Sequence, residues 1–130
     1  MYHGDLMEYV SLIREIGFGV DLVEGRDDKA VRRAIHDIIH RVAIPYLREA
    51  GLDLSSILLR ILIFTPNPDK VEDNVIVNEL PLKFGKIIIE KHAGGAQFDN
   101  TIASIVVLEI NIPKQTLHQY RQASSDAQRC

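Results

Sequence analysis

Residues 57–65, Ile-Leu-Leu-Arg-Ile-Leu-Ile-Phe-Thr, are the most apolar stretch of the chain and are bounded by Ser55-Ser56 and Pro66. Successive side chains of a strand point to opposite faces of a sheet. One face of this stretch would carry Ile57, Leu59, Ile61 and Ile63, and the other Leu58, Arg60, Leu62 and Phe64. Both faces are apolar with one embedded charge, which predicts a central strand in a sheet that is covered, or nearly covered, on both sides.

The chain has 130 residues, of which 46% are hydrophobic and 25% charged, the balance of an ordinary globular domain. We expect one globular α+β domain over residues 1–121 and a flexible polar tail over residues 122–130. The single cysteine, Cys130, allows no internal disulfide, which favours a reducing compartment. No signal-peptide pattern and no apolar run of ~20 residues is present. The sequence therefore predicts a soluble cytoplasmic protein that does not contact a membrane.

Two helices are predicted in the first half of the chain. Apolar residues over 5–16 have helical spacing, and Gly17 is placed to end that helix. Residues 18–22 alternate like a short strand. A second, long amphipathic helix starts at Asp27 or Asp28, which can cap it, kinks near Pro45 and ends by Gly51. Its apolar stripe consists of Val31, Ile35, Ile38, Ile39, Val42 and Tyr46.

The second half of the chain is predicted to consist mainly of strands. Residues 75–77 predict a short strand, residues 87–92 a further strand, residues 93–96 a loop, and residues 101–112 a long β-branched strand ended by Pro113. Pro113 can begin a short helix carrying Leu117 and Tyr120. The fold class is thus α+β, with two or three layers and the long helix packed on a mixed or antiparallel sheet of four or five strands.

Sorting the strand residues by parity predicts one almost wholly apolar sheet face that matches the helix stripe. That face would carry Ile57, Leu59, Ile61, Ile63, Ile87, Ile89, Ile102, Val106, Leu108, Ile110 and Ile112. The opposite face mixes apolar residues with charges, and its members are Leu58, Arg60, Leu62, Phe64, Ile88, Glu90, His92, Ala103, Ile105, Val107 and Glu109. Three hypotheses account for so apolar a second face: cover by the first helix, a dimer interface, or a ligand pocket.

Arg60 needs partners, because a guanidinium in the middle of a central strand loses hydration. Glu90 and Glu109 on neighbouring strands can provide them. One hypothesis is a structural cross-strand ion pair. In the other, Arg60 binds a carboxylate or phosphate of a small molecule, and Glu90 or His92 acts as acid or base. Replacing Arg60 with Met separates these hypotheses, because the first predicts changed stability and the second predicts lost binding.

The remaining motifs carry less information. His36 and His40 have a spacing that can hold one metal ion, but no third ligand is evident, so no metal or other cofactor is predicted. A basic flank on the second helix is diluted by acidic residues, and the net charge is -3, which argues against nucleic acid as a partner. No P-loop, dinucleotide fingerprint or nucleophile elbow occurs.

The sequence therefore predicts a non-catalytic binding or assembly module, homodimeric, that recognises itself or another molecule through the second sheet face. The residues expected to carry this role are Arg60, Glu90, His92, Glu109, Leu62 and Phe64. The alternative is a small acid-base enzyme, an isomerase or hydrolase, with an anionic small-molecule substrate bound at Arg60.

Overall fold

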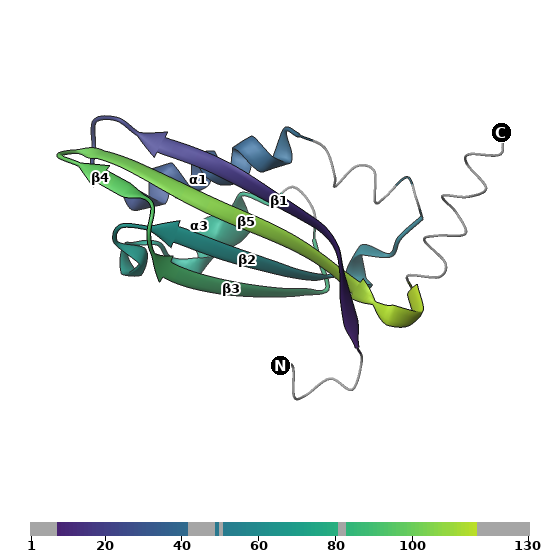
Figure 1. Cartoon of the computed structure of the whole chain (residues 1–130). Coiled ribbons are helices and arrows are strands. Elements are labelled where there is room, and N and C mark those ends of the chain that lie inside the picture. Colours follow the sequence, from purple (N-terminus) through teal and green to yellow (C-terminus); the bar gives the residue numbers. More distant parts are fainter. Residues whose placement is uncertain (1–7, 42–48, 50, 81–82, 117–130) are drawn as a thin grey trace.

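The structure is a computed structural model, and it describes residues 8–41, 49, 51–80 and 83–116. It is an α+β fold built on a mixed five-stranded sheet with the order β1-β5-β2-β3, in which β4 pairs with β5 beyond the end of β2 (Figure 1). The strands are β1 Tyr9–Asp21, β2 Leu58–Thr65, β3 Lys86–Ala93, β4 Ala96–Phe98 and β5 Thr101–Pro113. Strands β2 and β3 are parallel, and the other pairs are antiparallel.

The helices α1 (Asp27–Ile39) and α3 (Asp73–Asn78) lie on one face of the sheet, behind the strands in Figure 1. Two short 3-10 helices, Leu54–Ser56 and Pro68–Lys70, flank β2. The predicted central strand is confirmed, because β2 pairs with β5 on one side and β3 on the other. The predicted apolar face is also confirmed. It packs against α1 in a core that includes Val31, Ala34, Ile35, Ile38, Leu59, Ile61, Ile63, Val106, Leu108, Ile110 and Ile112.

Helix α1 has 13 residues, and it is the long helix among the described residues. The predicted continuation past residue 41, with a kink near Pro45, falls largely on residues 42–48, outside the described part of the chain. Arg26 occupies the N-cap position, and Asp27 does not cap the helix as expected. The buried Asp27 carboxylate instead accepts hydrogen bonds from the Thr65 hydroxyl at 2.6 Å and the Asn67 backbone N–H at 2.9 Å. It therefore ties the start of α1 to the end of β2.

The predicted first helix is wrong where the structure describes it, because β1 is a strand that pairs along β5. A bulge between Ser11 and Ile13 explains the misleading pattern. One extra residue shifts the side-chain parity, so both Val10 and Ile13 pack against the core. Their spacing of three then resembles the spacing of a helix. The short strand expected at residues 18–22 is the second half of β1.

Gly17 does not end a helix but lies inside β1, where it faces α1. A Cβ atom at Gly17 would come within 2.3 Å of the Ala34 carbonyl oxygen, and one at Gly19 within 2.0 Å of the Ala30 carbonyl oxygen. Real Cβ atoms do not approach carbonyl oxygens so closely. The two glycines therefore let the backbones of α1 and β1 come into direct contact.

Two further predictions are corrected. Residues 75–77 belong to the helix α3, because a helical turn buries Ile76 in the core, and this packing outweighs the β propensity of Val75 and Val77. The loop expected at residues 93–96 is shorter, and β4 follows it directly. The Gly94 N–H donates to the Thr65 carbonyl at 3.1 Å, which holds the chain across the end of β2. Leu117, Tyr120 and the tail from residue 122 lie outside the described residues.

The close approach of α1 to β1 predicts that Gly19→Ala lowers the free energy of unfolding by about 2–3 kcal/mol through overpacking. The matched control is Gly51→Ala. Its φ of 81° disfavours alanine, but no atom of the described residues other than its chain neighbours lies within 4 Å of the added Cβ, so only the backbone cost of about 1 kcal/mol applies. Urea denaturation measures both values. Equal losses in the two variants would contradict the close-contact explanation.

Candidate functional site

The sheet face opposite α1 and α3 is the candidate site, and we call it the open face. Its members are Arg14, Ile16, Phe18 and Val20 of β1, Ala103, Ile105, Val107 and Glu109 of β5, Arg60, Leu62 and Phe64 of β2, and Ile88, Glu90 and His92 of β3. Neither α1 nor α3 lies on it (Figure 1). Ile16 and Phe18 remain 50% and 61% exposed, which is high for large apolar side chains in a strand. The hypothesis that a helix of residues 5–16 covers this face is therefore wrong for the residues described.

A row of four charges crosses the open face from β1 to β3. Arg14 lies directly opposite Glu109, and Glu109 lies directly opposite Arg60. Arg14 Nε donates to Glu109 Oε2 at 2.5 Å, and Arg60 NH1 lies 3.9 Å from Glu109 Oε1. Arg60 Nε donates to Glu90 Oε2. The signs alternate along this charge row, which consists of Arg14, Glu109, Arg60 and Glu90.

His92 extends the row towards the outer edge of β3. Its Nε2 atom lies 3.9 Å from Glu90 Oε1, and its ring stacks on Phe64 with centroids 5.3 Å apart and an interplanar angle of 20°. Leu62 lies directly opposite Val107 on β5 and Glu90 on β3. The structure thus places all six residues chosen from the sequence on one face, and it links five of them by contacts.

Both carboxylates of the charge row are held in the ionised form. The hydrogen bond from Arg60 lowers the pKa of Glu90 below its ordinary value and outweighs the partial desolvation of that side chain. Burial acts to raise the pKa of Glu109, but hydrogen bonds from Arg14 and Asn111 and the charges of Arg14 and Arg60 outweigh it, so this pKa is also lowered. Carboxylates of this kind bind cations well and are poor proton donors near neutral pH.

Sequence reasoning missed Arg14, because it assigned this residue to a helix. The signal was present in the sequence. Phe18 and Val20 were already expected to alternate in a strand, and the same parity continued backwards places Ile16 and Arg14 on their face. The ion pairs expected between Arg60 and the two glutamates both form, and Arg14 is a second cation at Glu109.

A shallow hollow of about 370 Å³ lies at one end of the open face. It is lined by Phe18, Gly19, Val20, Gly95, Ala96, Ala103, Ser104 and Ile105. This lining is mainly apolar, and within the described part of the chain it includes no member of the charge row. The hollow therefore offers shape for an apolar group and no acid or base.

The structure describes both members of the histidine pair noted in the sequence, His36 and His40, and it brings no third metal ligand to them among the described residues. The rings of His36 and His40 stand edge to face with centroids 6.4 Å apart, and His36 Nε2 contacts Glu79, the residue that follows α3. Among residues 8–41, 49, 51–80 and 83–116, no three His, Cys, Asp or Glu side chains lie close enough to share a metal ion. The helices of the same residues are too short or too polar to cross a membrane.

The fold and the open face define an α+β protein with a mixed sheet that its described helices cover on one side only. Residues 11–111 match the family model described as "Conserved hypothetical protein (Lin0512_fam)". This match spans most of the chain, so the protein belongs to the Lin0512 family. No curated protein matches the sequence.

Solved structures include similar folds. A crystal structure of an FtsZ-like protein of unknown function from Nostoc punctiforme has a TM-score of 0.71 and 23% identity, over 83% of this chain and 99% of that chain. A W319Y mutant of FtsZ from M. jannaschii gives a TM-score of 0.41 at 18% identity, over 74% of this chain and 27% of that chain. The first similarity shows a shared fold, and this chain spans about a quarter of the FtsZ chain.

The lowered pKa of Glu109 predicts a pH-dependent contribution to stability. The charged form is favoured in the folded state, so the contribution is present above about pH 4.5, the ordinary value, and is lost as the pH falls through the lower folded-state pKa. Glu109→Gln should lower the free energy of unfolding by about 1–2 kcal/mol at pH 7, because it weakens charged hydrogen bonds. The difference from the wild type should shrink as the pH falls below about 4.5.

Urea denaturation at several pH values measures this difference, and Glu72→Gln is the control, because Glu72 is an exposed carboxylate outside the charge row. A gap between the wild type and Glu109→Gln that stays constant from pH 7 to pH 3 would show that the charge of Glu109 contributes nothing.

Proposed function

We propose that this protein is a non-catalytic assembly module that forms a homodimer through the open face. The observation that carries the proposal is the row of alternating charges set among exposed apolar side chains on that face. An interface with an apolar centre and a few paired charges is typical of symmetric dimers. We also propose a cytoplasmic location, because a single cysteine indicates a chain made for a reducing compartment.

The charge row supports pairing with a second copy, because it is self-complementary. Its order across the strands is positive, negative, positive, negative. A twofold axis parallel to the strands, passing between Glu109 and Arg60, reverses this order in the partner. Arg60 of each copy then faces Glu109 of the other, and Arg14 lies across from Glu90, offset by two residues along the strand. Such an arrangement fixes the orientation of the two copies as well as attracting them.

The apolar residues around the row supply the favourable free energy in this proposal. Ile16, Phe18 and Val20 are exposed, and the neighbouring Ile105 and Val107 are partly buried. Removing such surface from water stabilises an interface by roughly 25 cal/mol per Å². The ion pairs within one chain are already formed, so the dimer needs little rearrangement of charged side chains.

The enzyme alternative has less support. A general acid near neutral pH needs a carboxyl whose pKa is raised, and the pKa values of Glu90 and Glu109 are lowered. The hollow on the open face is apolar and lies apart from the charge row. A small anion at Arg60 would also have to displace the two glutamates that it contacts.

Two valines of nearly equal exposure provide the test. Val20 is 39% exposed on the open face, and Val77 is 40% exposed on α3, on the other side of the sheet. A buried, unpaired carboxylate strongly disfavours association. Val20→Glu should therefore weaken the dimer at least about tenfold, whereas Val77→Glu should leave its dissociation constant unchanged. Sedimentation equilibrium over a range of concentrations measures both.

A wild-type chain that stays monomeric at all concentrations would refute the dimer. A dimer that Val77→Glu weakens as much as Val20→Glu would refute the open face as its interface. Far-ultraviolet circular dichroism of each variant confirms that it is folded before its mass is compared.

A further inference from the structure

Among the described strands, β1 lies at the edge of the sheet and pairs with β5 on one of its two sides. The outer side of such a strand presents unpaired N–H and C=O groups, to which another strand can add. In β1 these groups belong to alternate residues, among them Ile16, Phe18 and Val20. Side chains of Arg33 and Asp37 on α1, and of Arg41 just beyond its end, bind one backbone group of each of these three residues.

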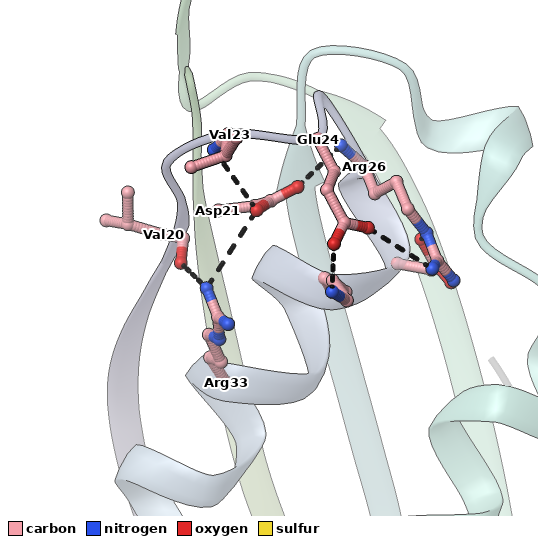
Figure 2. A network of polar contacts seen from close by, with 8 residues as sticks. Val20, Asp21, Val23, Glu24, Arg26 and Arg33 are labelled. Carbon is pink, nitrogen blue, oxygen red and sulfur yellow. Dashed lines mark hydrogen bonds and ion pairs between the residues drawn. The ribbon is translucent and has the colours of Figure 1, made fainter. Parts of the chain in front are cut away.

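The three contacts form a regular ladder. Arg33 NH1 donates to the Val20 carbonyl at 2.6 Å, the Phe18 N–H donates to Asp37 Oδ2 at 3.0 Å, and Arg41 NH2 donates to the Ile16 carbonyl. Figure 2 shows the first contact, together with the approach of Arg33 to Asp21 at 4.0 Å. Arg33 and Arg41 thus donate hydrogen bonds to backbone carbonyls of β1, and Asp37 accepts one from a backbone N–H of the same strand.

The spacing of the ladder follows from helix and strand geometry. Arg33, Asp37 and Arg41 are four residues apart, which is about 6 Å along a helix. Their partners are two residues apart, which is about 6.7 Å along a strand. The spacing between these side chains nearly equals the spacing between their partners on β1. A row of side chains four residues apart can therefore contact three successive outward-facing residues of the strand. Arg41 NH2 also bonds Asp37 Oδ2 at 3.0 Å, which keeps two members of the row aligned.

We propose that the Arg33-Asp37-Arg41 ladder is a removable cover over the edge of β1, and that the uncovered edge takes the β1 strand of a second copy of this chain. Side chains in a ladder cannot themselves extend the sheet, so the cover prevents pairing that the backbone would otherwise allow. All three side chains are about half exposed, so an incoming strand can displace them.

The choice of a second β1 as the occupant rests on the sequence of that edge. Two identical strands related by a twofold axis pair antiparallel, and each supplies the groups that the other lacks. Ile16, Phe18 and Val20 are β-branched or aromatic residues with exposed side chains, which favour cross-strand pairing. Pairing at this edge would also join the two open faces into one continuous surface. It is a different contact from the face-to-face dimer proposed above and does not depend on it.

The test compares R33A/D37A/R41A with the control R32A/H36A. Arg32 and His36 lie on α1 and are also half exposed, but both contact Glu79, the residue that follows α3. Sedimentation equilibrium should show a mass at least about twofold larger than that of the wild type for the ladder variant at high concentration, and more than twofold if the wild type is already a dimer. The control should match the wild type. A folded ladder variant whose mass equals that of the wild type at every concentration would overturn the proposal.

The single variant Asp37→Ala provides a second measurement that does not depend on the stability of the triple variant. At low concentration, exchange of the Phe18 amide hydrogen should become at least about fivefold faster, because its acceptor is lost. At high concentration the same amide should become protected again by the second strand. Unchanged exchange of the Phe18 amide at low concentration, or no renewed protection at high concentration, would each overturn the proposal.

Discussion

The fold depends on the contact between one apolar sheet face and helix α1. Strands β2 and β5 carry large aliphatic residues towards α1, and burial of these residues removes most of that face from water. Gly17 and Gly19 bring the helix backbone onto β1 itself. The position of α1 and α3 on one side of the sheet determines which sheet face these helices leave exposed. Because α1 and α3 both lie on the same face, neither helix covers the opposite face of the sheet.

The charges on the open face are organised rather than scattered. Arg14 and Arg60 hold Glu109 between them, and Arg60 also holds Glu90. Each charge therefore has an opposite charge beside it before any partner arrives, which lowers the cost of burying the row in an interface. The same pairing lowers the pKa values of Glu90 and Glu109, so both carboxylates are ionised near neutral pH.

The sequence was sufficient to predict which side chains form the apolar sheet face, but not to predict that residues 9–21 form the strand β1. Alternation in residues 57–65 and 101–112 predicts which residues of β2 and β5 face the core, and the structure confirms those sides. The bulge after Ser11 disrupted the same alternation in β1 and imitated a helix. With β1 misassigned, neither Arg14 nor the edge ladder could be predicted, since both depend on where β1 lies. The helix at residues 73–78 depends on burial of Ile76, which local propensity does not reveal.

The most direct test of this account measures which methyl groups of the open face water can reach. A soluble paramagnetic agent should relax the methyl resonances of Ile16, Ile105 and Val107 strongly in dilute protein and weakly in concentrated protein, because a second copy then covers them. Val77 on α3 should relax equally at both concentrations. If the relaxation of the Ile16, Ile105 and Val107 methyls does not change with concentration, as expected for Val77, the open face is not an interface between copies.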